Sequence, residues 1–200
     1  GQGLFVQTDI AKRDQVAAMV ARTVEAYGRL DVAVNNAGIE GTPFVTTAHY
    51  DEAVWDAVLA VNLTGVFLCM KHQLPHLLAA GGGAIINVAS VAGLVGGRFG
   101  VGYYASKHGV IGLTKATALE YADQGVRVNA VCPAIVRTPL VEKYLEDNPA
   151  LEAQLTALHP MGRVGTPEEG AEAVAWLASP RSAFTTGHAL VLDGGRLITQ

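Results

Sequence analysis

Residues 84–88, Ala-Ile-Ile-Asn-Val, decide the fold class of this chain of 200 residues. This short apolar run is typical of a strand buried on both faces, and it lies between two long stretches with helical character, 51–78 and 102–122. Strands joined by long helices are parallel, because each crossover returns the chain to the same end of the sheet. Further strands are predicted at 4–6, 32–34, 126–131 and 189–192. The sequence therefore predicts a doubly wound α/β sheet in a single domain, 1–200, with helices on both faces.

Two other helices carry clear start and stop signals. Between residues 16 and 27 the apolar side chains recur on one helical face, and Gly28 ends the pattern. At 166–169 the sequence Thr-Pro-Glu-Glu offers a capping threonine, a first-turn proline and a glutamate at the third helical position. We therefore predict helices over 16–27 and 166–178.

Composition excludes several classes of protein. Half of the residues are hydrophobic and 16% are charged, which suffices for a core and argues against long disorder. The net charge is −4 and the 14 Lys and Arg residues are scattered, so we expect no nucleic-acid partner. The longest uncharged stretch, 72–97, contains Pro75, Asn87 and three successive glycines, so we expect no membrane-spanning helix there.

The cysteines and two histidines have ordinary structural interpretations. Cys69 and Cys132 each lie in an apolar run without metal-ligand spacing, which predicts buried, reduced thiols in a cytoplasmic protein. His72 and His76 are four residues apart, but Pro75 interrupts them and no third ligand is near in the sequence. This favours surface histidines over a zinc site.

Polar or turn-forming residues follow four of the predicted strands. Asp9, Asn35, Ser90 and Pro133 stand at their carboxyl ends. Ligands of doubly wound sheets bind beyond the carboxyl ends of the strands. We therefore expect these four segments to line one crevice.

Tyr103 and Lys107 form the most chemically informative pair. They are four residues apart on a predicted helix and therefore share a face. A phenol has a pKa near ~10, and lowering it by about three units needs roughly 4 kcal/mol. An ammonium ~4 Å away supplies about that energy at an effective dielectric constant near 20. The pair is therefore a candidate for proton transfer near neutral pH.

Further motifs surround this pair. The sequence has Asn-Asn-Ala-Gly at 35–38, Asn62, Ser90 thirteen residues before Tyr103, and Asp-Gly-Gly at 193–195. With Asp9 and the segment 129–138, these elements resemble those of the short-chain dehydrogenase/reductase family, in order, from Gly1 to about Gly195. The resemblance implies a Rossmann-like fold, NAD or NADP as cofactor, and hydride transfer between that cofactor and a secondary alcohol or ketone.

The resemblance also implies roles for catalytic residues. Tyr103 would be the general acid in reduction and the general base in oxidation, and Ser90 would hold and polarise the substrate oxygen. Lys107 would lower the pKa of Tyr103 and hydrogen-bond the nicotinamide ribose. Asn62, at a helix distortion, would position through its backbone carbonyl a water that links Lys107 to solvent.

Other residues are implied to bind the cofactor. Besides Tyr103 and Lys107, the set is Asp9, Ile10, Asn36, Ala37, Gly38, Pro133, Ile135 and Thr138. Asp9 would contact the adenine amino group, with capping of the next helix as the alternative interpretation. Asn36 has a turn asparagine as its alternative. The family usually has Pro-Gly where this chain has Pro133-Ala134, which allows a small shift of that loop.

The chain departs from the family at its start. No glycine-rich turn of the pattern T-G-x-x-x-G-x-G is present, and residue 1 aligns with what should be the third strand. Two strand–helix units, on the order of 50 residues, are therefore expected to be missing from a partial record, so the fold is predicted to be N-terminally incomplete. The strand at 4–6 should then be unpaired. The choice between NAD and NADP depends on the missing units.

The segment 139–165 is predicted to be a substrate lid, because it is irregular and rich in leucine. The expected substrate is a small secondary alcohol or ketone, and the resemblance implies a homotetramer. One alternative is a 3-oxoacyl carrier-protein reductase, which would need a basic entrance. A second alternative is a non-catalytic relative acting as an oligomeric binding protein. An enoyl reductase is disfavoured, because that branch spaces its tyrosine and lysine more widely.

Overall fold

The computed structural model describes residues 1–146 and 149–199, and its centre is a four-stranded parallel sheet. The strands are β1 (Val32–Asn35), β2 (Gly83–Val88), β3 (Val126–Pro133) and β4 (Ala189–Leu192), and they lie side by side in that order. Each pair is parallel, as the register shows where Val34 lies opposite Ile86 and Ile86 opposite Asn129. Four of the five predicted strands and the parallel topology are thus confirmed.

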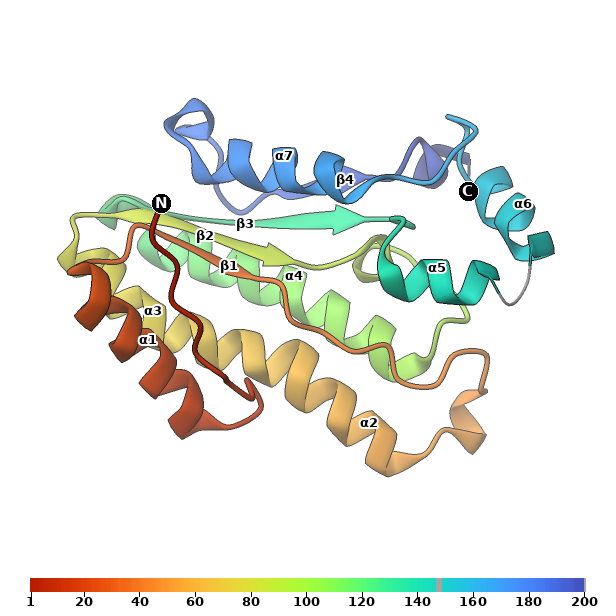
Figure 1. Cartoon of the computed structure of the whole chain (residues 1–200), viewed down its shortest axis with the longest axis horizontal. Coiled ribbons are helices and arrows are strands. Elements are labelled where there is room, and N and C mark those ends of the chain that lie inside the picture. Colours follow the sequence, from red (N-terminus) through yellow and green to blue (C-terminus); the bar gives the residue numbers. More distant parts are fainter. Residues whose placement is uncertain (147–148, 200) are drawn as a thin grey trace.

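Helices cover both faces of the sheet (Figure 1). The helices α3 (Val66–Ala79) and α4 (Val101–Tyr121) lie on one face, and α7 (Pro167–Ala178) lies on the other. The first helix, α1 (Arg13–Tyr27), packs on α3 and ends at Gly28, whose φ of 80° is the left-handed conformation that glycine favours. This is the predicted doubly wound, Rossmann-like architecture.

Strand β2 shows why the run 84–88 carries no polar face. Ile85 and Ile86 are both 0% exposed. Ile85 packs into the cluster beneath α3 and α4, whereas Ile86 packs with Leu177 of α7 on the opposite face. Burying each isoleucine stabilises the fold by about 1.5–3 kcal/mol, so the alternation of faces fixes the register of the central strands.

The prediction of a strand at 4–6 is wrong in this structure. The segment pairs with no strand in the described part of the chain, and the side chain of Phe5 is 88% exposed. A strand exists only where a neighbour accepts and donates its backbone hydrogen bonds, so β propensity without a partner gives an irregular segment. In the described part of the chain β1 pairs with β2 alone, which leaves its other edge free.

The long helical stretch predicted over 51–78 contains a distortion. It begins with α2 (Glu52–Leu59), capped by the Asp51 carboxylate, which accepts from the backbone N–H groups of Ala53 and Val54. A π-helical turn, η2 (Ala60–Gly65), then joins α2 to α3. A π turn makes each N–H reach one residue further back, and such turns cluster at functional sites.

By length and composition alone, Glu52–Ala79 could cross a membrane, with a mean hydropathy of 1.8 over its most apolar window. The stretch 72–97 singled out in the sequence is a different segment. Helix α3 packs against β1 and β2, while α2 packs against α4, and the buried amides of Asn62 and Gln73 hydrogen-bond inside the protein. These contacts are those of a core helix in an α/β domain.

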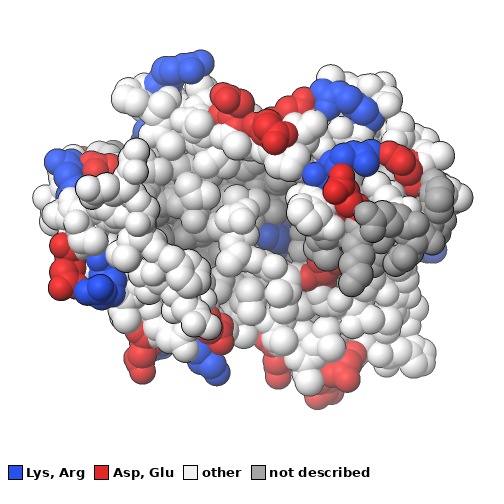
Figure 2. Space-filling model, viewed as in Figure 1, with Lys and Arg blue, Asp and Glu red and all other residues white. Residues whose placement is uncertain are grey.

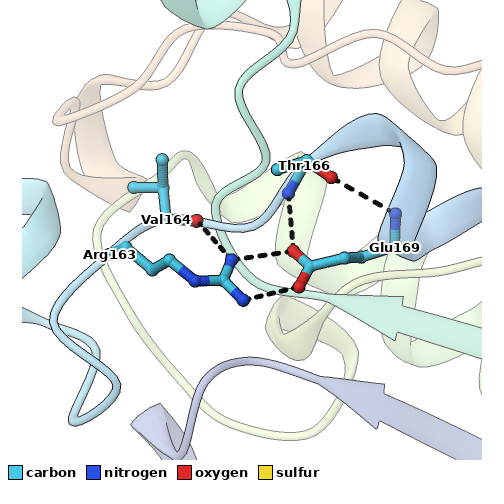
Figure 3. A network of polar contacts seen from close by, with 4 residues as sticks. All are labelled: Arg163, Val164, Thr166 and Glu169. Carbon is cyan, nitrogen blue, oxygen red and sulfur yellow. Dashed lines mark hydrogen bonds and ion pairs between the residues drawn. The ribbon is translucent and has the colours of Figure 1, made fainter.

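The remaining helices lie beyond the carboxyl ends of the strands or lead into α7. Helices α5 (Pro139–Glu146) and α6 (Pro149–Ala157) form much of the predicted lid, beyond the end of β3 (Figure 1). The capping box predicted at the start of α7 is confirmed, because the Thr166 hydroxyl accepts from the Glu169 N–H and the Glu169 carboxylate accepts from the Thr166 N–H. The Arg163 guanidinium donates two hydrogen bonds to the same carboxylate, at 2.6 and 2.9 Å (Figure 3).

Candidate active site

A buried network of amides holds the carboxyl ends of β1 and β2 together. Asn35 Nδ2 donates to Asn87 Oδ1 at 2.8 Å, and Gln73 Nε2 donates to Asn35 Oδ1 at 2.9 Å. Asn87 Nδ2 in turn donates to Thr114 Oγ1 of α4 at 3.0 Å. All four side chains are at most 7% exposed, so they fix the strands relative to both helices beneath them. Sequence reasoning missed Gln73, Asn87 and Thr114, although a polar residue inside the apolar run 84–88 was a visible signal.

Asn62 lies in the π turn and ties the loop after β1 to α4. Its amide group accepts from the Ile39 N–H and donates to the Ile39 carbonyl, both at 2.8 Å. It also donates to Ser106 Oγ at 3.3 Å. The helix distortion predicted at Asn62 is thus present, and here the side chain binds the loop backbone.

Gly38 brings that loop against the lysine. A Cβ atom at Gly38 would lie 3.3 Å from Asn62 Oδ1 and 3.6 Å from Lys107 Nζ. A side chain at Gly38 would press on the Asn62 amide and touch the Lys107 ammonium. Because glycine has none, the backbone of 36–38 can pass close to both groups.

Tyr103, Ser90 and Lys107 meet at the carboxyl end of β2. Ser90 lies near enough to the Tyr103 phenol to lower its pKa, and the Ser90 hydroxyl accepts from the Ala92 N–H at 3.1 Å. Lys107 Nζ lies 5.5 Å from the centroid of the Tyr103 ring and donates to the Val88 carbonyl at 2.9 Å. Phe99 packs edge-on against the Tyr103 ring with centroids 5.6 Å apart. The phenol, hydroxyl and ammonium of the predicted set therefore share one small site.

The electrostatics of Tyr103 differ from the expectation. Burial raises the pKa of Tyr103, the hydrogen bond with Ser90 lowers it, and the charges of Glu40 and Tyr104 raise it. The Lys107 ammonium donates its hydrogen bond to the Val88 carbonyl at the end of β2, and its lowering of the Tyr103 pKa stays a prediction.

Lys107 is itself strongly perturbed. Its side chain is only 5% exposed, and burial lowers the pKa of Lys107 to about 8, with a small opposing effect from Cys132. Taking an ammonium out of water disfavours its charged form. The group is still mainly protonated at neutral pH, and it loses its proton within the range in which enzymes are assayed.

The residues present fit a nicotinamide cofactor at the strand ends. Among the described residues, Val88 O takes one of the three N–H donors of Lys107, which leaves two for the hydroxyl groups of a ribose. The exposed segment 36–38 passes beside that ammonium, and the backbone after β3 lies across the crevice, since Ser90 Oγ contacts the Pro133 carbonyl at 3.4 Å. Ile135 and Thr138 continue this segment towards α5, and their proposed contacts with the cofactor remain predictions.

Asp9 and Ile10 lie in the turn before α1. The Asp9 carboxylate accepts from the Ala11 N–H at 2.9 Å, while Lys12 occupies the N-cap of α1, so the alternative interpretation of Asp9 as that cap is wrong. Asp9 lines a surface hollow with Gln7, Thr8 and Gln15. The Ile10 side chain packs on Gly65, so only its backbone is available to a ligand.

The cysteines and histidines behave as structural residues. Cys69 and Cys132 are free and buried, as predicted, and burial raises the pKa of each thiol to about 11. Within residues 1–146 and 149–199, no group of three or more potential metal ligands lies close together. His72 is partly buried rather than fully at the surface.

One side of the molecule is hollowed. Figure 2 shows a depression between the layer of α7 and the layers beneath it, on the side where β1 has no neighbouring strand among the described residues. The fold is that of the doubly wound α/β proteins, in which ligands bind beyond the carboxyl ends of the strands, and a tyrosine, a serine and a lysine lie together there.

Comparison with known proteins identifies the family. A family model described as enoyl-(acyl carrier protein) reductase matches residues 1–196. Cyclohexanol dehydrogenase from Acinetobacter sp. (strain SE19) is 45% identical over 194 residues, which are 97% of this chain and 74% of that protein. Cis-4-hydroxycyclohexanecarboxylate dehydrogenase from Sinomonas cyclohexanicum is also 45% identical, over 97% of this chain and 76% of that protein. The chain belongs to the short-chain dehydrogenase/reductase family of NAD(P)-dependent oxidoreductases.

Two further similarities bear on cofactor and alternatives. The solved structure of ElxO with NADP bound matches with a TM-score of 0.93 and 36% identity, over 98% of this chain and 79% of that one. A 3-oxoacyl-[acyl-carrier-protein] reductase from Thermotoga maritima is 43% identical over 190 residues, 95% of this chain and 75% of that protein. Although the family model carries the name of an enoyl reductase, Tyr103 and Lys107 keep the four-residue spacing of the alcohol dehydrogenases.

Proposed function

We propose that this enzyme oxidises alicyclic secondary alcohols to ketones, reversibly, with NAD or NADP. The observation that carries the proposal is the convergence of Tyr103, Ser90 and Lys107 at one strand end, with Asn62 fixing the loop opposite. Cyclohexanol and 4-hydroxycyclohexanecarboxylate, the substrates in the names of two relatives, supply the substrate class.

Each residue has a separate task in the oxidation. Ser90 holds the alcohol oxygen by a hydrogen bond, and Tyr103 accepts the hydroxyl proton. Lys107 stabilises the phenolate charge and binds the ribose with its remaining donors, while Asn62 keeps the loop 36–39 in place against it. A nicotinamide held beside Lys107 would supply the acceptor for the hydride that leaves the carbinol carbon. In the reverse direction Tyr103 returns the proton to the carbonyl oxygen.

The strongest alternative is a 3-oxoacyl carrier-protein reductase, which the similarity to the Thermotoga protein favours. Such an enzyme would need a basic entrance for its acidic carrier, and the Lys and Arg residues of this chain are scattered along the sequence. A non-catalytic binding protein is the second alternative, and the intact set of catalytic side chains argues against it.

We also propose a cytoplasmic homotetramer that has no membrane or nucleic-acid partner. Support comes from the buried free cysteines, the scattered basic residues and two large apolar side chains at the surface, Leu119 of α4 at 84% and Phe184 at 106% exposure. Light scattering of the purified protein measures the assembly, and a monomer would contradict it.

The experiment that tests the proposed function is a panel of secondary alcohols and ketones with NAD and with NADP, followed at the nicotinamide absorbance. We expect turnover of cyclohexanol and cyclohexanone. Turnover of 3-oxoacyl thioesters alone would favour the reductase, and binding of cofactor without turnover of any substrate would favour the binding protein.

A further inference from the structure

Ser106 lies between members of the catalytic set without belonging to it. Its side chain, on helix α4, is 0% exposed. The Ser106 hydroxyl donates to the Tyr103 carbonyl at 2.8 Å and accepts from Asn62 Nδ2 at 3.3 Å. The hydroxyl therefore uses its one donor and an acceptor position, and each partner is a residue to which the mechanism gives a task.

The Asn62 amide depends on this hydroxyl. The amide oxygen accepts from the Ile39 N–H, and one amide hydrogen goes to the Ile39 carbonyl, both at 2.8 Å. The Ser106 hydroxyl takes the other hydrogen. Because Asn62 is only 1% exposed, loss of the hydroxyl would leave a buried donor without a partner. The three hydrogen bonds therefore hold the amide in one orientation.

The Tyr103 carbonyl joins the two catalytic residues of α4. In an α-helix a carbonyl accepts from the N–H four residues further on, which for Tyr103 is that of Lys107. The Ser106 hydroxyl adds a second hydrogen bond to the same acceptor. A serine that bonds back to its own helix in this way bends the helix slightly. The Ser106 hydroxyl thus acts on the angle at which α4 presents the Tyr103 ring.

Close packing surrounds this connection. A Cβ atom at Gly109 would lie 2.8 Å from the Leu63 side chain of η2, and one at Gly102 would lie 3.5 Å from the Trp55 ring of α2. Helix α4 therefore touches its neighbours both before and after Ser106. With no gap at these points to take up a movement, the position of Asn62 is passed to Tyr103 through the Ser106 hydroxyl.

We propose that Ser106 is a positioning residue, which couples the loop at Ile39 to the catalytic tyrosine through the Asn62 amide. The inference rests on the role of Tyr103 in the proposed function and not on which alcohol is oxidised. The buried hydroxyl touches no substrate. It fixes the place from which Tyr103 takes the alcohol proton, and the rate of that transfer depends steeply on geometry.

Ser106→Ala tests the inference, because alanine removes the hydroxyl and suits a helix. With the best alcohol of the panel and saturating NAD(P), we expect the first-turnover rate in stopped flow to fall about tenfold. The ratio of this rate in light water to that in heavy water should rise, because proton transfer has become slower. Without cofactor, the Ile39 N–H should exchange its hydrogen about tenfold faster, since the Asn62 amide has lost a partner.

Thr23→Val is the matched control. The Thr23 hydroxyl also donates to a carbonyl about one turn earlier in its helix, that of Met19 at 2.9 Å, but the helix is α1. This variant should leave the rate, the isotope ratio and the Ile39 exchange unchanged. Because the isotope ratio does not depend on the fraction of folded enzyme, it separates positioning from partial unfolding.

The outcomes distinguish this inference from the proposed function. If the unmodified enzyme oxidises an alcohol of the panel and Ser106→Ala keeps the rate within about twofold, the inference is overturned and the function stands. A slower Ser106→Ala with unchanged isotope ratio and unchanged Ile39 exchange also overturns it, because Ser106 would then act on stability alone. If the unmodified enzyme oxidises no alcohol, the proposed function fails and the inference fails with it.

Discussion

Lys107 Nζ lies 5.5 Å from the centroid of the Tyr103 ring and donates a hydrogen bond to the Val88 carbonyl at 2.9 Å. The ammonium thus anchors α4 to the end of β2 while it stands one helical turn from the phenol. Because the lysine is buried, its charge costs folding free energy. We therefore expect Lys107 to lower the free energy of unfolding and yet to be required for activity.

Replacing Tyr103 by phenylalanine tests the proton-transfer role. Tyr103→Phe removes the only atom that can take the hydroxyl proton and keeps the ring that packs on Phe99. We expect kcat for cyclohexanol to fall by about 10³-fold, with the affinity for NAD(P) unchanged within about twofold. Stopped-flow turnover and fluorescence titration of the cofactor measure the two quantities. Retained turnover would refute the role given to Tyr103.

Lys107→Met is expected to abolish activity and to stabilise the fold at pH 7. The pKa of Lys107 falls from 10.5 to about 8, and 2.5 pKa units correspond to about 3 kcal/mol. Loss of the hydrogen bond to Val88 O offsets about 1 kcal/mol, so the free energy of unfolding should rise by about 2 kcal/mol.

The pH dependence gives the sign of that effect. Between pH 8 and 10.5 the unfolded chain binds more protons at Lys107 than the native protein does, so the native protein gains stability from this group as the pH rises. The advantage of Lys107→Met should therefore be largest below pH 8 and shrink above it. Urea unfolding at several pH values measures it, with exposed Lys115→Met as the control. An advantage that does not change with pH would contradict the explanation.

Asn87→Ala tests the amide network under the site. The change removes one acceptor of Asn35 Nδ2, which keeps only a longer bond to Gln73 Oε1 at 3.3 Å, and removes the donor to Thr114 Oγ1, whose own bond to the Val110 carbonyl remains. We expect the free energy of unfolding to fall by ~1–3 kcal/mol. Urea denaturation measures it, and Asn36→Ala, in the exposed turn next to Asn35, should change stability by less than about 0.5 kcal/mol. Equal losses in both variants would show that the network adds nothing.

Gly93 and Gly112 together test how closely α4 must pack against the loop that carries Ser90. A Cβ atom at Gly93 would lie 2.6 Å from the Lys107 carbonyl, so Gly93→Ala must push α4 away from the loop that carries Ser90. We expect a loss of ~2 kcal/mol in the free energy of unfolding and a fall in kcat. At Gly112, which lies within α4, nothing lies within 4 Å of the added methyl group.

Gly112→Ala is therefore the control. It should stabilise the helix by roughly 0.5–1 kcal/mol, because alanine loses less backbone entropy than glycine. Thermal unfolding and steady-state kinetics on both variants decide the matter. If Gly93→Ala is as stable and active as Gly112→Ala, the close approach of α4 to this loop contributes neither to stability nor to catalysis.

Local pattern was enough to predict much of this protein. Alternating short apolar runs and long amphipathic stretches predicted four strands, their parallel arrangement and the helices between them. The capping residues Thr166 and Glu169 predicted the start of α7, because a cap involves residues only three apart. The four-residue spacing pointed to Tyr103 and Lys107, because residues one helical turn apart share a face, and the resemblance to the family pointed to Ser90 and Asn62.

Features that depend on partners distant in the sequence required the tertiary structure. The segment 4–6 has strand propensity, yet its state depends on whether a neighbour supplies hydrogen bonds. Three features each join segments separated by many residues: the partners of Asn87, the direction of the Lys107 ammonium and the bond between Asn62 and Ile39. Sequence alone determined which chemical groups this protein possesses. Only the packing of helices on the sheet decided which of those groups face one another and how far water is excluded from them, because burial and distance set the strength of every charge interaction.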